Sequence, residues 1–173
     1  MRVGLVSDTH GHLDPLLHTL FARCALILHA GDVVREAVLA ALERIAPVTA
    51  IRGNNDEGTS LARLPETALV RLGDLTALVV HDLGPRERPK PPARGLIERE
   101  RPAIVVHGHS HRPDVALVCG TLFVNPGSAG PRRFSLPRAA AILTVRGRTA
   151  RVELFDLAGT RLAILGEPVE ATL

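Results

Sequence analysis

Short apolar runs bounded by polar residues mark the strands in the first half of the chain. These runs lie at 2–7, 25–29 and 48–52. A continuous apolar run of this length is typical of a strand that is buried on both faces. We therefore expect three buried strands in this half.

Two helices are predicted between these strands. Apolar residues from Leu13 to Phe21 recur every three or four positions, which is the stripe of a helix that packs on one face. Asp14 followed by Pro15 suits the start of this helix, because Asp caps free amide groups and Pro fits the first turn. A second helix is expected at 34–45. Alternating strands and helices predict a parallel sheet covered by helices.

Hairpins replace this order in the second half. The runs 68–72 and 75–80 are joined by Gly73 and Asp74, which is a hairpin signal. The segment 82–95 is rich in Pro and Arg and predicts an exposed, mobile loop. The remaining predicted elements are a helix at 96–101, a strand at 103–106, and paired strands at 115–118 with 122–124 and 139–145 with 150–155.

One domain accounts for the whole chain. The length of 173 residues and a hydrophobic content of 46% allow a sizeable core, and no repeat or change in composition divides 1–173. Parallel units followed by hairpins predict an α/β (α+β) domain with two sheets.

Composition restricts the location and partners of the protein. Apolar runs are too short to cross a bilayer, and the N-terminus becomes polar too early for a signal peptide, so we expect a cytoplasmic protein with no membrane contact. Cys24 and Cys119 are predicted to be free thiols. The net charge of +3 is mildly basic, but Trp and Tyr are absent and the Arg residues are scattered. Specific binding of nucleic acid is therefore not indicated.

Polar residues of metal-binding type follow successive predicted strands. They occur in "SDTHGH", "AGD", "GNND", "VVHD" and "GHSH", and comprise Asp8, His10, Asp32, Asn54, His81, His109 and His111. Each motif alone is a weak signal, since a lone Asp-x-His or Gly-Asp is more often a turn. Their order is informative because sites form outside the carboxyl ends of the strands in α/β sheets. Asn54 and Asn55 are adjacent in a chain with three Asn and no Gln, which suggests a chemical requirement.

These motifs resemble the calcineurin-like metallophosphoesterases, in particular the small bacterial and archaeal phosphodiesterases of the YfcE type. The resemblance runs from Val3 to about Ser128 and includes "NPGS" at 125–128. It implies a single-domain, four-layer αββα sandwich of two mixed sheets with the metal site at the strand ends.

The resemblance also implies which residue holds which metal ion. One ion would be bound by Asp8, His10 and His111, and the other by Asn54, His81 and His109. Asp32 would bridge the two. We expect Mn²⁺, with Ni²⁺, Zn²⁺ and Fe²⁺ as alternatives, because imidazole and carboxylate suit all of these ions.

The implied activity is hydrolysis of small or nucleotide-like phosphodiesters by a two-metal mechanism with a bridging hydroxide. Asn55 stands where many superfamily members have the His proposed to protonate the leaving group. An amide cannot supply that proton, so we expect leaving groups that need little protonation. Asn55 is instead a candidate to bind a phosphoryl oxygen, and His12 is a further candidate for substrate contact. "GDVVR" lacks the Gly-Asp-x-x-Asp-Arg-Gly pattern of protein phosphatases.

Other positions have simpler interpretations. His107 and His29 are expected to be buried and hydrogen-bonded, and His18 to be solvated. Asp82 follows His81 where the family often has Gly. The basic residues of the 82–95 loop either form a solvated connection or attract phosphorylated substrate, with Arg132 and Arg133 as helpers.

Three alternatives to a diesterase stay open. The first is a non-catalytic, metal-containing scaffold or protein-binding module of the same fold, for which a subunit of the retromer coat is a precedent. The others are a phosphomonoesterase and a nuclease of the same superfamily. A complete set of seven ligands favours the enzyme over the scaffold. A homo-oligomer is also expected, because relatives of this type are often oligomeric.

Overall fold

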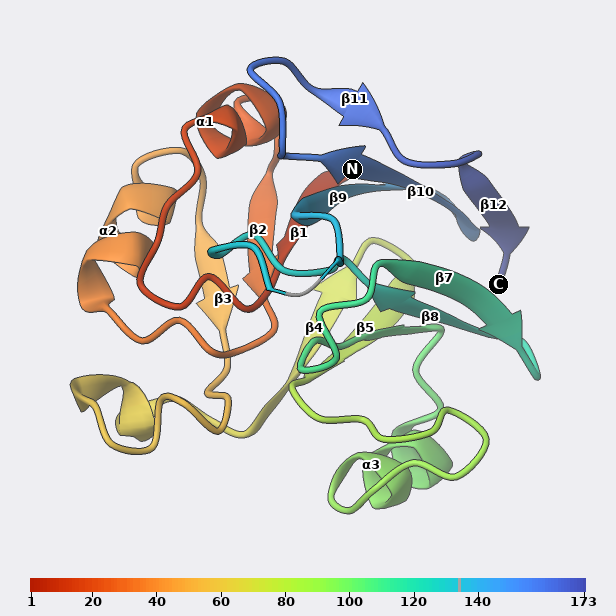
Figure 1. Ribbon diagram of the computed structural model, residues 1–173. Coiled ribbons are helices and arrows are strands. Elements are labelled where there is room, and N and C mark those ends of the chain that lie inside the picture. Colours follow the sequence, from red (N-terminus) through yellow and green to blue (C-terminus); the bar gives the residue numbers. More distant parts are fainter. Residues whose placement is uncertain (134) are drawn as a thin grey trace.

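Two sheets face each other at the centre of the computed structural model, which describes residues 1–133 and 135–173 (Figure 1). The first sheet has the strand order β11-β10-β9-β1-β2-β3, with β12 also paired to β10. Its strands are β1 (Arg2–Val6), β2 (Leu26–His29), β3 (Val48–Ala50), β9 (Ala139–Arg146), β10 (Thr149–Asp156), β11 (Ala163–Ile164) and β12 (Val169–Thr172). β1, β2 and β3 run parallel, whereas β9 is antiparallel to β1, so the sheet is mixed.

The second sheet has the order β4-β5-β6-β8-β7. Its strands are β4 (Thr67–Leu72), β5 (Leu75–Val80), β6 (Ile104–Val106), β7 (Asp114–Val118) and β8 (Thr121–Asn125). β5, β6 and β8 run parallel, and the two edge strands are antiparallel to their neighbours. The carboxyl ends of the parallel strands of this sheet therefore share one edge.

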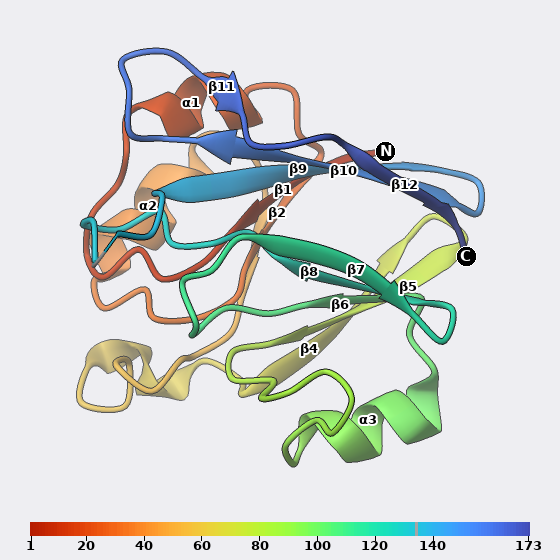
Figure 2. The same cartoon turned by 45° about the vertical axis from the view of Figure 1, so that its right-hand side comes forward.

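Helices cover the outer faces of both sheets. α1 (Leu16–Phe21) and α2 (Glu36–Glu43) pack against the outer face of the first sheet. α3 (Ala93–Glu100) packs against the second sheet, on the side that faces away from the first (Figure 2). A short 3₁₀ helix, Ser60–Arg63, follows β3. This is the four-layer αββα arrangement that the family resemblance implies. No helix in the described residues is long and apolar enough to span a membrane.

Three apolar layers hold the sandwich together. Leu5 and Val106 lie in the core between the sheets, while their neighbours Val6 and Val105 face the helix layers. Successive residues of a strand point to opposite faces, so a strand buried on both faces must be apolar at every position. This explains why the central strands appear in the sequence as continuous apolar runs.

Most predicted elements are present, with differences at their ends. The amide of Leu16 donates to Asp14 Oδ1 at 2.8 Å, which is the expected cap of α1. α3 begins at Ala93, three residues before the predicted start and inside the predicted loop, because Ala93 packs fully buried under the second sheet. β11 and β12 were not predicted, since their short and partly exposed segments carry little apolar pattern.

Candidate metal centre

All seven predicted ligands converge at the carboxyl ends of the strands. Each comes from a connection that directly follows β1, β2, β3, β5 or β6. The first ligand set is the one predicted for one ion, Asp8, His10 and His111, and in it His111 Nε2 lies 3.2 Å from Asp8 Oδ1 and 3.2 Å from His10 Nε2. The second ligand set is the one predicted for the other ion, Asn54, His81 and His109, and in it Asn54 Oδ1 lies 3.1 Å from both His81 Nε2 and His109 Nδ1.

Asp32 lies between these two sets. Its Oδ2 atom is 3.4 Å from His81 Nε2 and 3.9 Å from His10 Nε2. The position matches the bridging role that the family resemblance implies. The assignment of individual ligands to individual ions stays a prediction.

The donor set fits divalent metal ions. Two ligand atoms that bind one ion at about 2.1 Å lie roughly 3 Å apart, which is close to the spacing within each set. Asp8 Oδ1 is completely buried and has no hydrogen-bond partner among the described residues, although the other oxygen accepts the His109 amide at 3.0 Å. A buried carboxylate oxygen without a partner is costly unless a cation pairs with it. Asp8 and its neighbours therefore form a site suited to metal binding.

Left-handed backbone conformations turn these side chains toward one centre. The φ angles of the residues concerned are 53° for Asp8, 47° for His10, 55° for Asp32, 66° for His109 and 56° for His111. This conformation is uncommon for residues other than Gly and is found at functional sites where the surrounding fold imposes it. Five of the seven predicted ligands thus sit on strained turns.

Close packing explains two of the glycines around the centre. A Cβ atom on Gly53 would overlap Asp32 Oδ1, and one on Gly108 would overlap Ser7 Oγ and approach Asp8 Oδ2. Only Gly lets these loops pass so near the carboxylates.

Asp56 supports the centre and was not identified from the sequence. Its carboxylate is fully buried and accepts amide groups from Gly53 at 2.8 Å, Val34 at 2.6 Å and Val33 at 3.3 Å. Val34 itself has a φ of 70°, which is strained for a β-branched residue. Asp56 therefore ties the loop that carries Asp32 to the loop that carries Asn54. The signal available was the final Asp of "GNND".

Hydrogen bonds fix the charge and orientation of the central groups. His81 Nδ1 lies 2.7 Å from the Ala30 carbonyl, so it donates there and the Nε2 edge of the ring faces the centre. Burial opposes a charged His81, but the nearby Asp32 and Asp8 carboxylates outweigh it and raise its pKa. Burial likewise disfavours the Asp32 carboxylate, yet hydrogen bonds from His81 and Asn55 lower its pKa. For His10, burial and the charge of Arg133 lower the pKa.

The two predicted substrate-contact residues lie in different surroundings. Asn55 is exposed and donates to both oxygens of Asp32, through its amide at 2.8 Å and its Nδ2 at 2.6 Å. His12 is exposed on the turn after β1, and its side chain makes no hydrogen bond with the described residues. Their contact with substrate stays a prediction.

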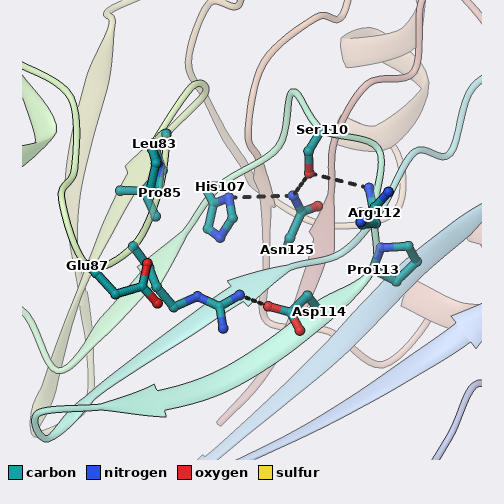
Figure 3. Close-up of a pocket in the computed structure, with 11 residues that line it drawn as sticks. Leu83, Pro85, Glu87, His107, Ser110, Arg112, Pro113, Asp114 and Asn125 are labelled. Atoms are coloured by element: carbon teal, nitrogen blue, oxygen red, sulfur yellow. Dashed lines mark hydrogen bonds and ion pairs between the residues drawn. The ribbon is translucent and has the colours of Figure 1, made fainter.

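His107 lines a separate cavity of about 420 Å³, and none of the seven predicted ligands is among the described residues that line it (Figure 3). Its Nδ1 lies 3.4 Å from Asn125 Nδ2, and the burial of the ring lowers its pKa to about 4. Asn125 Nδ2 also donates to Gly108 O and Ser110 Oγ, each at 3.0 Å. Asn125, from the "NPGS" motif, therefore fastens the loop that carries His109 and His111.

The other histidines behave as expected from the sequence. His29 is fully buried, its Nε2 lies 3.1 Å from Thr9 Oγ1, and burial lowers its pKa to about 4. His18 is exposed.

Most basic side chains of the 82–95 loop are paired with acids. Lys90 lies 2.6 Å from Asp82, Arg94 lies 3.0 Å from Glu98, and Arg86 pairs with Asp114 on β7. Pairing leaves little free positive charge on this loop. Arg133 instead lines a hollow of about 130 Å³ with His109 and His111, which places it beside the centre.

Comparisons with known proteins agree with this geometry. A family model described as the calcineurin-like phosphoesterase superfamily domain matches residues 1–148. The Probable metallophosphoesterase YsnB of Bacillus subtilis is 30% identical over 169 residues, covering 94% of this chain and 95% of YsnB. A Probable metallophosphoesterase of Methanothermobacter thermautotrophicus is 27% identical, covering 89% and 91%. The Phosphodiesterase MJ0936 of Methanocaldococcus jannaschii is 26% identical, covering 73% and 83%.

Solved structures share the fold. Vacuolar Protein Sorting 29 of Cryptosporidium parvum superposes with a TM-score of 0.82 at 21% identity, covering 99% of this chain and 98% of that one. Vps29 of Entamoeba histolytica, solved in complex with Zn²⁺, has a TM-score of 0.78 at 21% identity, with coverage of 98% and 99%. YfcE, a phosphoesterase from E. coli, has a TM-score of 0.70 at 20% identity and 99% coverage of both chains. At this identity the likeness establishes the fold alone.

Proposed function

Because the chain belongs to the calcineurin-like phosphoesterase superfamily, we propose that it is a metal-dependent phosphodiesterase that hydrolyses small or nucleotide-like phosphodiesters. The observation that carries this proposal is the position of Asp32 Oδ2 between two sets of nitrogen and oxygen donors. A curated relative named a phosphodiesterase supports the diester as the substrate class.

Seven side chains would hold two divalent ions. Asp8, His10 and His111 form the first set, Asn54, His81 and His109 form the second, and Asp32 serves both. Such a pair of ions, when bound, lowers the pKa of water and neutralises charge on the phosphoryl oxygens. We propose Mn²⁺ as the working ion, since a site of imidazole and carboxylate accepts several divalent metals and selection depends on their supply.

The residues around the ions have separate tasks. Asn55 holds Asp32 in place through two hydrogen bonds and brings no proton for a leaving group. The guanidinium of Arg133 borders the hollow beside His109 and His111, where it can attract the anionic phosphate. Substrates with good leaving groups should therefore react fastest, because the amide of Asn55 cannot supply a proton.

The proposal extends to the location, the partners and the assembly of the protein, for which the sequence composition and the family resemblance are the grounds. We propose a cytoplasmic enzyme that acts on a small-molecule phosphodiester, requires neither membrane nor nucleic acid as a partner, and assembles as a homo-oligomer.

Hydrolysis of bis(p-nitrophenyl) phosphate tests the proposal. Metal-stripped protein would be assayed after addition of Mn²⁺, Ni²⁺, Zn²⁺ or Mg²⁺, alongside Asp32→Asn and the control Asp74→Asn. Asp74 is exposed at the β4–β5 turn, at the opposite end of β5 from the predicted ligand His81. We expect a transition metal to restore turnover, Asp32→Asn to reduce it roughly 100-fold or more, and Asp74→Asn to match the native chain.

The alternatives predict other results. Bound metal without turnover of any ester would contradict an enzyme and support a scaffold, for which partner capture would be the next experiment. Preference for p-nitrophenyl phosphate would indicate a phosphomonoesterase, and cleavage of a single-stranded oligonucleotide would indicate a nuclease.

A further inference from the structure

His109 is the least enclosed of the four predicted histidine ligands. Its side chain is 45% exposed, compared with 8% for His10, 6% for His81 and 11% for His111. The ring of His81 is held by a backbone carbonyl, whereas the described hydrogen bonds give His109 no backbone partner for its ring. An exposed ring on a left-handed turn needs another group to fix its orientation.

The orientation of the His109 ring shows where that group must lie. Nδ1 faces Asn54 Oδ1 at 3.1 Å and thus points into the second ligand set. Nε2 points the other way, toward Asp82 Oδ2 at 3.8 Å. A histidine that gives its Nδ1 lone pair to a metal carries its proton on Nε2, and this N–H is commonly donated to a carboxylate.

Asp82 is itself held in place from two sides. Its Oδ1 accepts the amide of Gly84 at 3.1 Å, and its Oδ2 accepts from Lys90 Nζ at 2.6 Å. The backbone of Lys90 is fixed in turn, because its amide donates to the Leu83 carbonyl at 2.9 Å. The loop that follows β5 therefore presents an ionised carboxylate to the outer edge of the His109 ring.

We propose that Asp82 is a positioning residue for His109: it accepts the Nε2–H of that ring when a metal ion occupies Nδ1, while Lys90 holds the carboxylate in place. The separation of 3.8 Å is within ion-pair range and closes to a hydrogen bond by adjustment of these two partly exposed side chains. This inference rests on the proposed metal centre and concerns only the second ligand set. It assigns a role to the residue that replaces the Gly of the family pattern, and to the one lysine of the chain.

A purely structural role for the same residues predicts a different outcome. If Asp82 and Lys90 only anchor the loop, replacing either should lower stability by a similar amount and leave the affinity for metal unchanged. If Asp82 orients His109, its replacement should weaken one metal ion selectively.

Metal titration separates these roles. Metal-stripped native protein, Asp82→Asn, Asp82→Gly, Lys90→Met and the control Asp74→Asn would be titrated with Co²⁺, whose visible absorption reports each binding step. We expect two ions in the native chain. In Asp82→Gly one of the two steps should lose affinity about 10-fold to 100-fold, with a smaller loss in Asp82→Asn, which keeps an acceptor oxygen, and in Lys90→Met. The other step and the control should not change.

A second measurement keeps the test valid if the Gly variant is unstable. In Zn²⁺-loaded protein with ¹⁵N-labelled histidine, the NMR spectrum should show His109 protonated at Nε2, and that signal should shift in Asp82→Asn. Unchanged affinity for both ions in folded Asp82 variants, or His109 protonated at Nδ1, would overturn the inference while leaving the proposed function intact. Failure of the native chain to bind two ions would overturn both.

Discussion

Asn55 forms hydrogen bonds to both oxygens of Asp32: its backbone amide donates to Oδ1 at 2.8 Å and its side-chain Nδ2 donates to Oδ2 at 2.6 Å. Oδ2 is also the atom that lies between the two ligand sets. Asn55, which stands where many superfamily members have the proposed acid, thus acts on the central carboxylate. Its side chain is exposed, yet it already has a hydrogen-bond partner within the protein.

Replacing Asn55 should weaken catalysis equally for all leaving groups. Asn55→Ala keeps the backbone hydrogen bond but removes the one to Oδ2, so we expect kcat/KM to fall about 10-fold. The loss should be the same for bis(p-nitrophenyl) phosphate and for a dialkyl phosphodiester, which has an alkoxide as its leaving group. A loss confined to the dialkyl ester would show instead that Asn55 assists the leaving group.

Asp56 should contribute more to stability than any exposed acid. Its buried carboxylate accepts three backbone amides, and Asp56→Asn replaces one acceptor oxygen with a donor that faces them. We expect the free energy of unfolding to fall by about 2 kcal/mol or more. Urea unfolding of metal-free protein measures this, with Asp74→Asn as the matched exposed control. Equal stability of the two variants would show that the buried hydrogen bonds of Asp56 are not needed.

Acid should destabilise the protein partly through His29. Burial lowers its pKa from 6.5 to about 4, so between these values the unfolded chain binds a proton that the folded chain does not. The stabilisation is complete above pH 6.5 and is lost progressively as the pH falls to about 4. At pH 5 the loss from this one group is roughly 2 kcal/mol.

A variant isolates that contribution. In His29→Leu, the free energy of unfolding of metal-free protein should decrease by about 2 kcal/mol less between pH 7.5 and pH 5 than in the native chain. The comparison uses the change with pH, so any constant cost of the substitution, such as the lost contact with Thr9, cancels. Parallel pH profiles for the two chains would mean that folding does not lower the pKa of His29.

The fold and the ligand cluster could be predicted from the sequence because both depend on local signals. Continuous apolar runs identify strands buried on both faces, and polar motifs after such runs identify the sheet edge where a site forms. The fold class and the family resemblance are confirmed by the two mixed sheets and the family match.

The remaining features depend on contacts between distant segments. The hydrogen bonds between Asn55 and Asp32 join residues 23 positions apart, and those of Asp56 join loops that follow different strands. The left-handed turns at Asp8 and His109 are set by the surrounding packing, because few residues other than Gly adopt this conformation and the residue type alone does not predict it. β12 forms only because the edge of β10 is available to pair with it.

Anomalous X-ray scattering from crystals grown with Mn²⁺ tests the central claim most directly. The account predicts two peaks about 3.5 Å apart, one among Asp8, His10 and His111 and the other among Asn54, His81 and His109, with Asp32 in contact with both. A single peak, or two peaks that Asp32 does not join, would contradict a shared two-metal centre.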